Sequence, residues 1–205
     1  MSYLKLSAAA LLGFALFTFT GCGTQPKHPN QLSTFDGDSY DSLTAAHAAL
    51  TSLRVSVSSS YPKYTTAFNQ AGAAYGVAYN AYATYRTAPA SSAAVTVAIA
   101  NLAVAIVSLE DTFQTDLHVS PQTVTNSRSK VMRLKAAAQQ HITISDILTE
   151  LEIAATIAES VPGTQPYSTL AAIVIKTTQT AVAALTAASG QPIDLSKIQP
   201  IAAIQ

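Results

Sequence analysis

Four histidines are the side chains in this 205-residue sequence best suited to proton transfer or metal binding. A serine or cysteine nucleophile would need one of them as a base, yet no G-x-S-x-G turn is present. A zinc site such as H-E-x-x-H needs ligands at helical spacing, which His28, His47, His118 and His141 lack. The sequence therefore predicts no catalytic residue, no metal site and no cofactor.

Each histidine also has a structural interpretation. His28 falls in a polar stretch that we expect to be a tether, and His47 falls on the inner face of an expected helix, where a buried, hydrogen-bonded imidazole is expected. His118 and His141 stand near expected helix ends, where the helix dipole favours a cation.

Carboxylates gather in two groups, which are Asp36, Asp38 and Asp41, and Glu110, Asp111 and Asp116. Paired acids can hydrolyse glycosidic bonds when they flank a cleft, so an envelope enzyme acting on polysaccharide stays open as an alternative. The first group lacks the remaining ligands of a calcium loop, including its closing glutamate. We expect that group to cap the helix that follows it.

Tyrosines form the densest group of aromatic residues, with six of them between positions 61 and 85. They are Tyr61, Tyr64, Tyr75, Tyr79, Tyr82 and Tyr85. The last four could form an exposed strip that binds a sugar, a peptide or a partner helix, because a tyrosine ring is apolar and its tip is polar. Alternatively, Tyr75, Tyr79 and Tyr82 lie in the seam between helices with their hydroxyls at the rim.

Cys22 is the only cysteine, so no disulfide can form within one chain. The residues before it have the parts of an export signal, with one charge at Lys5, an apolar run from Leu6 to Phe19 and small residues next to Cys22. The apolar run is shorter than the roughly 20 residues that span a bilayer. Residues 1–21 are therefore predicted to be a removable signal peptide.

The segment Phe19-Thr20-Gly21-Cys22 resembles the lipobox of bacterial lipoproteins, with Phe19 where leucine is usual. The resemblance implies that the Cys22 thiol receives a diacylglyceryl group, that cleavage occurs before Cys22 and that the new N-terminus is acylated. It also implies a membrane partner through this lipid and a location in the cell envelope, on a periplasmic or cell-surface face. Several acyl chains make such an anchor stable.

Composition limits the partners and the number of domains. The formal net charge is zero and charged residues make up 11% of the chain, so no basic stripe for nucleic acid is present. Residues 22–35 carry Pro26, Pro29 and Asn30 and are predicted to be a lipidated flexible tether. Residues 36–205 are long enough to form one domain without disulfides.

Apolar residues recur at helical spacing along most of that domain. The predicted helices cover residues 39–58, 62–87, 90–116, 120–140, 145–161 and 166–189, followed by an extended tail over 193–205. Asp38 or Ser39 is the predicted N-cap of the first helix. The third helix has the longest seam, formed by Val95, Ile99, Leu102, Ile106, Leu109 and Phe113.

These elements predict an all-α fold, a single antiparallel helical bundle of five to six helices with an extended N-terminal tether. The leading hypothesis is a membrane-anchored, noncatalytic lipoprotein that serves as an envelope structural module or binds an envelope protein or polysaccharide. An alternative is a membrane-active or pore-associated protein in which residues 90–109, with or without 170–188, insert into lipid.

Overall fold

The computed structural model describes residues 28–89, 92–116 and 167–205. Its α-helices are α2 (Thr34–Ser60), α3 (Thr65–Thr87), α4 (Ser92–Asp116) and α7 (Tyr167–Ala188), with single 3₁₀ turns η1 (Pro62–Tyr64) and η3 (Leu195–Ile198). The described residues contain helices and turns but no strand, which confirms the all-α class. The predicted helices at 120–140 and 145–161 lie outside the described residues, so the count of five to six stays a prediction.

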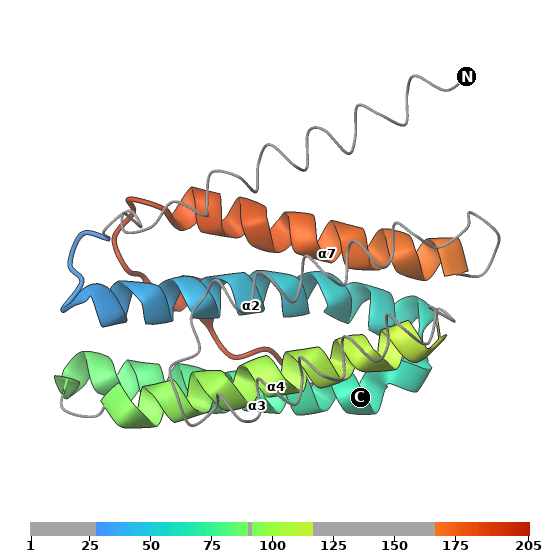
Figure 1. Ribbon diagram of the computed structural model, residues 1–205, viewed down its shortest axis with the longest axis horizontal. Coiled ribbons are helices and arrows are strands. Elements are labelled where there is room, and N and C mark those ends of the chain that lie inside the picture. The colour runs from blue at the N-terminus through green and yellow to red at the C-terminus, as the bar shows by residue number, and fades with distance from the viewer. Residues whose placement is uncertain (1–27, 90–91, 117–166) are drawn as a thin grey trace, which may run out of the picture.

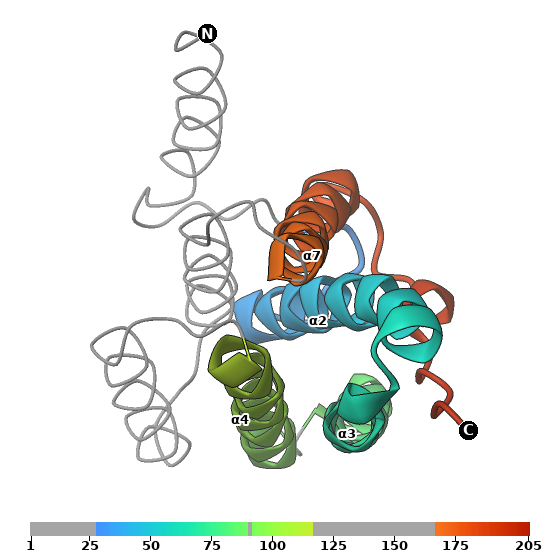
Figure 2. The ribbon, with the colours of Figure 1, turned by 90° about the vertical axis from the view of Figure 1, so that its right-hand side faces the viewer.

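The four helices run antiparallel to their neighbours along the chain, with α2 in the middle (Figure 1). α7 packs along one side of α2, and α3 packs along the other, while α3 and α4 lie side by side. The view in Figure 2 shows the same order from α7 through α2 to the α3–α4 pair. Helix α2 is therefore the element through which the described parts of the body are joined.

The helical spacing of Leu43, Ala46, Leu50, Leu53 and Val57 predicts a seam, and α2 buries all five of these residues. Ala45 and Ala49 are buried beside that seam. Small side chains on this helix let its backbone approach its neighbours closely, which suits a helix that packs on two sides.

The predicted start of this helix was wrong, because α2 begins at Thr34 and Ser33 is its N-cap. Ser33 has extended backbone angles, and its hydroxyl accepts a hydrogen bond from the Asp36 N–H at 3.2 Å. This bond satisfies one of the N–H groups of the first turn that have no partner within the helix, so Ser33 takes the role predicted for Asp38 or Ser39. Asp36 and Asp38 thus lie inside the helix rather than before it.

The spacing of Phe68, Gly72, Tyr75, Tyr79 and Tyr82 in the sequence predicts a seam along α3, and Phe68, Tyr75 and Tyr82 are buried there at intervals of seven residues. Between them the buried positions are Ala71 and Ala78, in place of Gly72 and Tyr79. A spacing of seven can be divided as three and four or as four and three, so the sequence pattern alone does not choose between these neighbours.

Helix α4 follows its predicted seam from Val95 to Leu109, since Val95, Ile99, Leu102, Ile106 and Leu109 are all buried. The side chain of Phe113, the last predicted member, lies outside the described residues. Val95, Val97 and Ile99 alternate in the sequence as in a strand, but the exposed Val97 lies on the opposite side of the helix from the other two. None of the described helices is long and apolar enough to cross a membrane.

Helix α7 ends where the sequence predicts, at a glycine. Gly190 has φ +70°, and the Gln191 N–H donates to the Ala188 carbonyl at 3.0 Å. A left-handed residue just past the last turn is a common helix ending, and glycine adopts it without steric cost. This turn directs the chain back along α2.

The C-terminal tail lies along the body, as predicted, with Ile193 and Ile198 buried. Asn69 fixes its end, because the side-chain amide donates to the Ile204 carbonyl at 3.0 Å and accepts from the Ile204 N–H at 2.9 Å. Arg54 on α2 donates to the Ala202 carbonyl at 3.0 Å. These bonds hold a segment that has little regular structure of its own.

The prediction of a flexible tether over 22–35 was wrong for its second half. His28 is 3% exposed, and Thr34 and Phe35 already belong to α2. The prolines and polar residues of this stretch indicated a linker, but its polar groups are paired with distant parts of the chain. The folded body therefore already includes His28 and does not begin at residue 36.

Candidate functional site

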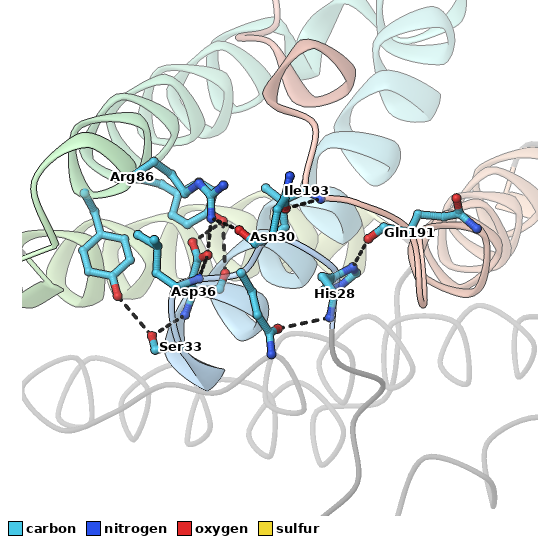
Figure 3. A network of polar contacts seen from close by, with 11 residues as sticks. His28, Asn30, Ser33, Asp36, Arg86, Gln191 and Ile193 are labelled. Atoms are coloured by element: carbon cyan, nitrogen blue, oxygen red, sulfur yellow. Dashed lines mark hydrogen bonds and ion pairs between the residues drawn. The ribbon is translucent and has the colours of Figure 1, made fainter.

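A network of polar residues joins separate segments at one end of the bundle (Figure 3). It connects residues 28–33, the first turns of α2, the end of α3 and the turn after α7. We call it the polar latch and define it as His28, Asn30, Ser33, Asp36, Asp41, Tyr82, Arg86, Gln191 and Ile193.

Asp36 is the centre of the polar latch, and its side chain is fully buried. The Tyr82 hydroxyl donates to Asp36 Oδ1 at 2.7 Å, and the Leu32 N–H donates to Oδ2 at 2.7 Å. Arg86 Nη1 donates to the same Oδ2 and completes an ion pair. A buried carboxylate is tolerated when both oxygens accept hydrogen bonds and a cation lies beside it, and Asp36 meets both conditions.

Burial, followed by the hydrogen bond and the charge of Asp36, raises the pKa of Tyr82 far above the usual range. The Tyr82 hydroxyl therefore stays protonated and remains a donor to the carboxylate at any ordinary pH.

Asn30 links the N-terminal segment to both α3 and the C-terminal tail. Its φ of +59° is left-handed, a conformation that asparagine tolerates better than most residues. In this conformation its carbonyl accepts from Arg86 Nη1 at 3.0 Å, while its Oδ1 accepts from the Ile193 N–H at 3.0 Å. One residue therefore holds two elements that are distant in sequence.

His28 contacts the turn after α7 and the second turn of α2. Its Nδ1 lies 2.8 Å from the Gln191 carbonyl oxygen, which can only accept, so Nδ1 carries a hydrogen. Its Nε2 lies 2.5 Å from Asp41 Oδ1. One proton must lie between those two atoms, either on the histidine as an ion pair or on the carboxyl group. The pair therefore holds one proton as long as this geometry persists.

The surroundings of Asp41 favour retention of that proton. Burial raises the pKa of Asp41, and the charge and hydrogen bond of His28 oppose that rise. Asp38 adds a negative charge that raises it further. The Tyr40 ring packs edge-on against the imidazole, with centroids 5.3 Å apart.

A glycine inside α2 makes room for this arrangement. The His28 N–H donates to Gln31 Oε1 at 3.1 Å. A Cβ placed at Gly37 would lie 2.7 Å from that same Oε1, well inside van der Waals contact. Any larger residue at Gly37 would therefore displace the amide that holds the His28 backbone.

The tyrosines predicted as a candidate binding strip lie mainly in the core. Tyr75, Tyr82 and Tyr85 are buried, and only Tyr79 is half-exposed. Tyr75 donates to the Ile198 carbonyl at 2.6 Å, while the hydroxyls of Tyr79 and Tyr85 pair with Gln199 and Ser33. Tyr75 and Tyr82 therefore lie in the seam between helices, and the hydroxyls of all four tyrosines bond to the N-terminal segment, to α2 or to the tail.

His47 lies on the inner side of α2, as predicted, and is half-buried. Its ring centroid is 5.7 Å from that of Tyr75. Burial lowers the pKa of His47, and a hydrogen bond to the Gln199 backbone opposes this effect. The imidazole is therefore neutral near pH 7, which agrees with a structural role.

A pocket of about 250 Å³ lies beside His47, between α2, α7 and η3. Its lining includes four alanines from α2 and α7, together with Gln191 and Lys197. Its volume is below the roughly 300–1,000 Å³ of typical small-molecule sites. It can take one side chain or one sugar ring.

The carboxylates, hydroxyls and imidazole of the polar latch all form hydrogen bonds within the body. Within residues 28–89, 92–116 and 167–205, no group of three or more histidine, cysteine or acidic side chains is placed to hold a metal ion. Cys22, His118 and His141 lie outside the described residues, as do the side chains of Glu110, Asp111 and Asp116.

One part of the polar latch, the N-cap of α2, can be recognised in the sequence. Ser33-x-x-Asp36 ahead of an apolar helix is the pattern of an N-cap with an acid at its third residue. The contact between His28 and Asp41 spans 13 residues and that between His28 and Gln191 spans 163, so no local pattern could reveal them.

Comparison with known proteins found no family model, no curated protein and no solved structure that matches this chain.

Proposed function

We propose that this protein is a noncatalytic lipoprotein, held at the face of a bacterial membrane by lipid on Cys22. Its helical body serves as an envelope structural module that binds an envelope protein or polysaccharide. The observation that carries the proposal is Phe19-Thr20-Gly21-Cys22, placed after an apolar run and six positions before the buried His28.

The position of the folded body supports this proposal. A lipid-modified cysteine needs a protein body that begins after it, so that the modified residue stays accessible to the membrane. His28 is the first described residue, and its buried side chain already belongs to the body. Cys22 precedes it by a short peptide, which is the order that a tethered protein requires.

The chemistry of the described residues supports a binding role over a catalytic one. The charged groups of the polar latch pair with each other and hold segments of the body together. The pocket beside His47 has room for one side chain or one sugar ring of a larger partner. Such a site suits the recognition of a protruding group on an envelope polymer or protein.

The experiment that tests the proposal is membrane partition of the full-length protein expressed in a bacterial host. The wild type should sediment with membranes and be released by detergent but not by alkaline carbonate. Cys22→Ala should appear in the carbonate-soluble fraction, because the anchor is the lipid and not the body. Cys22→Ser serves as a second variant of nearly the same size.

Two results would overturn the proposal. Recovery of the wild type in the soluble fraction would mean that no lipid is attached. Retention of Cys22→Ala in carbonate-washed membranes would mean that the chain itself inserts, as in the membrane-active alternative. Circular dichroism of each variant should show the same helix content, so that partition is compared between folded proteins.

A further inference from the structure

One end of the bundle gathers several chain segments that are far apart in the sequence. We call it the anchor end and define it as residues 28–34, 87–89, 92–94 and 188–192. In Figure 1 it is the left end, where α2 and α4 begin and α3 and α7 finish. The bond between His28 and Gln191 and the pair between Arg86 and Asp36 hold these segments together.

Cys22 can reach only a short distance from this end. Five residues separate it from His28. A fully extended chain covers at most about 3.3–3.6 Å per residue, so the two positions are no more than roughly 20 Å apart. A lipid on Cys22 would therefore keep His28 within about 20 Å of the lipid surface, whatever path the intervening residues take.

The attachment point at His28 is fixed in the body. Its ring is fully buried, its two nitrogens contact Gln191 and Asp41, and its N–H donates to Gln31. Residues 28–33 therefore cannot act as an additional swivel that would let the body turn over. The reach of the anchor applies to the rigid bundle itself.

The surface composition of the anchor end suits contact with lipid headgroups. Its residue ranges contain no lysine, arginine, aspartate or glutamate. The exposed positions include Pro29, Leu32, Ala88, Pro89 and Pro192, and Leu32 is 49% exposed. The charged groups just behind this surface, Asp36 and Arg86, are paired with each other. Contact with a headgroup layer therefore removes no unpaired charge from water.

We propose that the anchor end is the face that this protein lays toward the lipid surface. The helix axes then point away from the membrane surface. The connection between α2 and α3 lies at the end of the bundle that is farthest from the membrane. This inference rests on the proposed lipidation of Cys22. It adds which surface meets the membrane and which surface is left for a partner.

A pair of matched cysteine variants of the lipidated protein tests the orientation. Thr87→Cys is at the anchor end and Ser59→Cys is near the other end. Both residues are exposed near a helix C-terminus, and each hydroxyl bonds only to a carbonyl of its own helix or to the next serine. The 23 residues of α3 separate the two ends by about 35 Å. Because Cys22 is the only native cysteine, acylation leaves the added cysteine as the single free thiol.

Each variant is labelled with a small fluorophore, reconstituted in vesicles and titrated with headgroup nitroxide lipid. We expect the label at position 87 to lose most of its fluorescence and the label at position 59 to lose little. Equal quenching at both positions, or stronger quenching at position 59, would overturn the orientation. Intact mass is recorded on the same samples, so absence of acyl chains would identify failure of the lipidation proposal instead.

Discussion

Asp36 is the residue on which most of the polar latch depends, because it is fully buried and has no contact with solvent. Its carboxylate accepts from the side chains of α3 and from the backbone ahead of α2. Its partners offset the free energy cost of burial, since an ionised carboxylate without them would be costly to bury. The residues around Asp36 therefore act as one unit.

Tyr82→Phe removes a hydroxyl that donates to this buried carboxylate, and we expect it to lower the free energy of unfolding by about 1.5–3 kcal/mol. The phenyl ring keeps the packing of α3, so the loss reports the hydrogen bond. Tyr79→Phe is the matched control, because its hydroxyl pairs with Gln199 at the surface and its loss should cost less than about 1 kcal/mol. Urea denaturation of both variants measures the difference, and equal losses would contradict the role assigned to Asp36.

Asp41 should make the stability of the protein depend on pH. Burial raises the pKa of Asp41 above that of an aspartate in the unfolded chain, which is about 3.9, although the charge and hydrogen bond of His28 oppose the rise. Above the unfolded value the folded state therefore binds more protons at Asp41, so stability falls as pH rises through the folded value. The slope is at most about 1.4 kcal/mol per pH unit.

Asp41→Asn removes this carboxyl group, while its amide can still donate a hydrogen bond to His28 Nε2. As pH rises from about 4, urea midpoints should fall more steeply in the wild type than in the variant, because only the wild type loses a proton from Asp41. Asp38, Tyr40, His47 and Asp194 are present in both proteins, so the difference between the two curves reports the loss of the Asp41 carboxyl group. Parallel curves would contradict the raised pKa of Asp41.

At the scale of elements, the helices were predictable where apolar periodicity is long. Helix α4 matches its predicted seam, and α3 ends at Thr87 as predicted, because burial of a stripe requires helical spacing in the sequence itself. The choice between Ala71 and Gly72 was not predictable. It depends on which neighbouring helix lies on that side, and that is a property of the assembled bundle.

The polar latch was largely unpredictable for a related reason. A polar residue is buried only where its partners are present, and the partners of His28 and Asn30 come from other elements. The composition of residues 22–35 is that of a linker, so a linker was predicted. Only the N-cap formed by Ser33 had a local pattern that reveals it.

Truncation tests where the folded element begins. Chains that start at residue 22 and at residue 28 should unfold at the same denaturant concentration, because the polar latch is complete in both. A chain that starts at residue 33 leaves Asp41 without His28 and removes a backbone donor to Asp36. We expect it to lose about 3–5 kcal/mol, the range for breaking a buried charge pair. Equal stability of all three chains would instead support the prediction of a flexible tether up to residue 33.

At the scale of the whole molecule, the proposed lipid and the fixed part of the chain meet at the anchor end. We propose a lipid on Cys22, and the structure fixes the chain from His28 onward by bonds to α2, α3 and the turn after α7. A body attached in this way would be held close to a membrane by one defined face. The opposite end of the described helices would then face away from the membrane.

The measurement that tests the central claim most directly is the intact mass of the protein extracted from bacterial membranes, compared with that of Cys22→Ala. The account predicts a mass that lacks residues 1–21 and includes acyl chains, with no such addition in the variant. A wild-type mass that retains residues 1–21, or one that shows an unmodified Cys22, would contradict it.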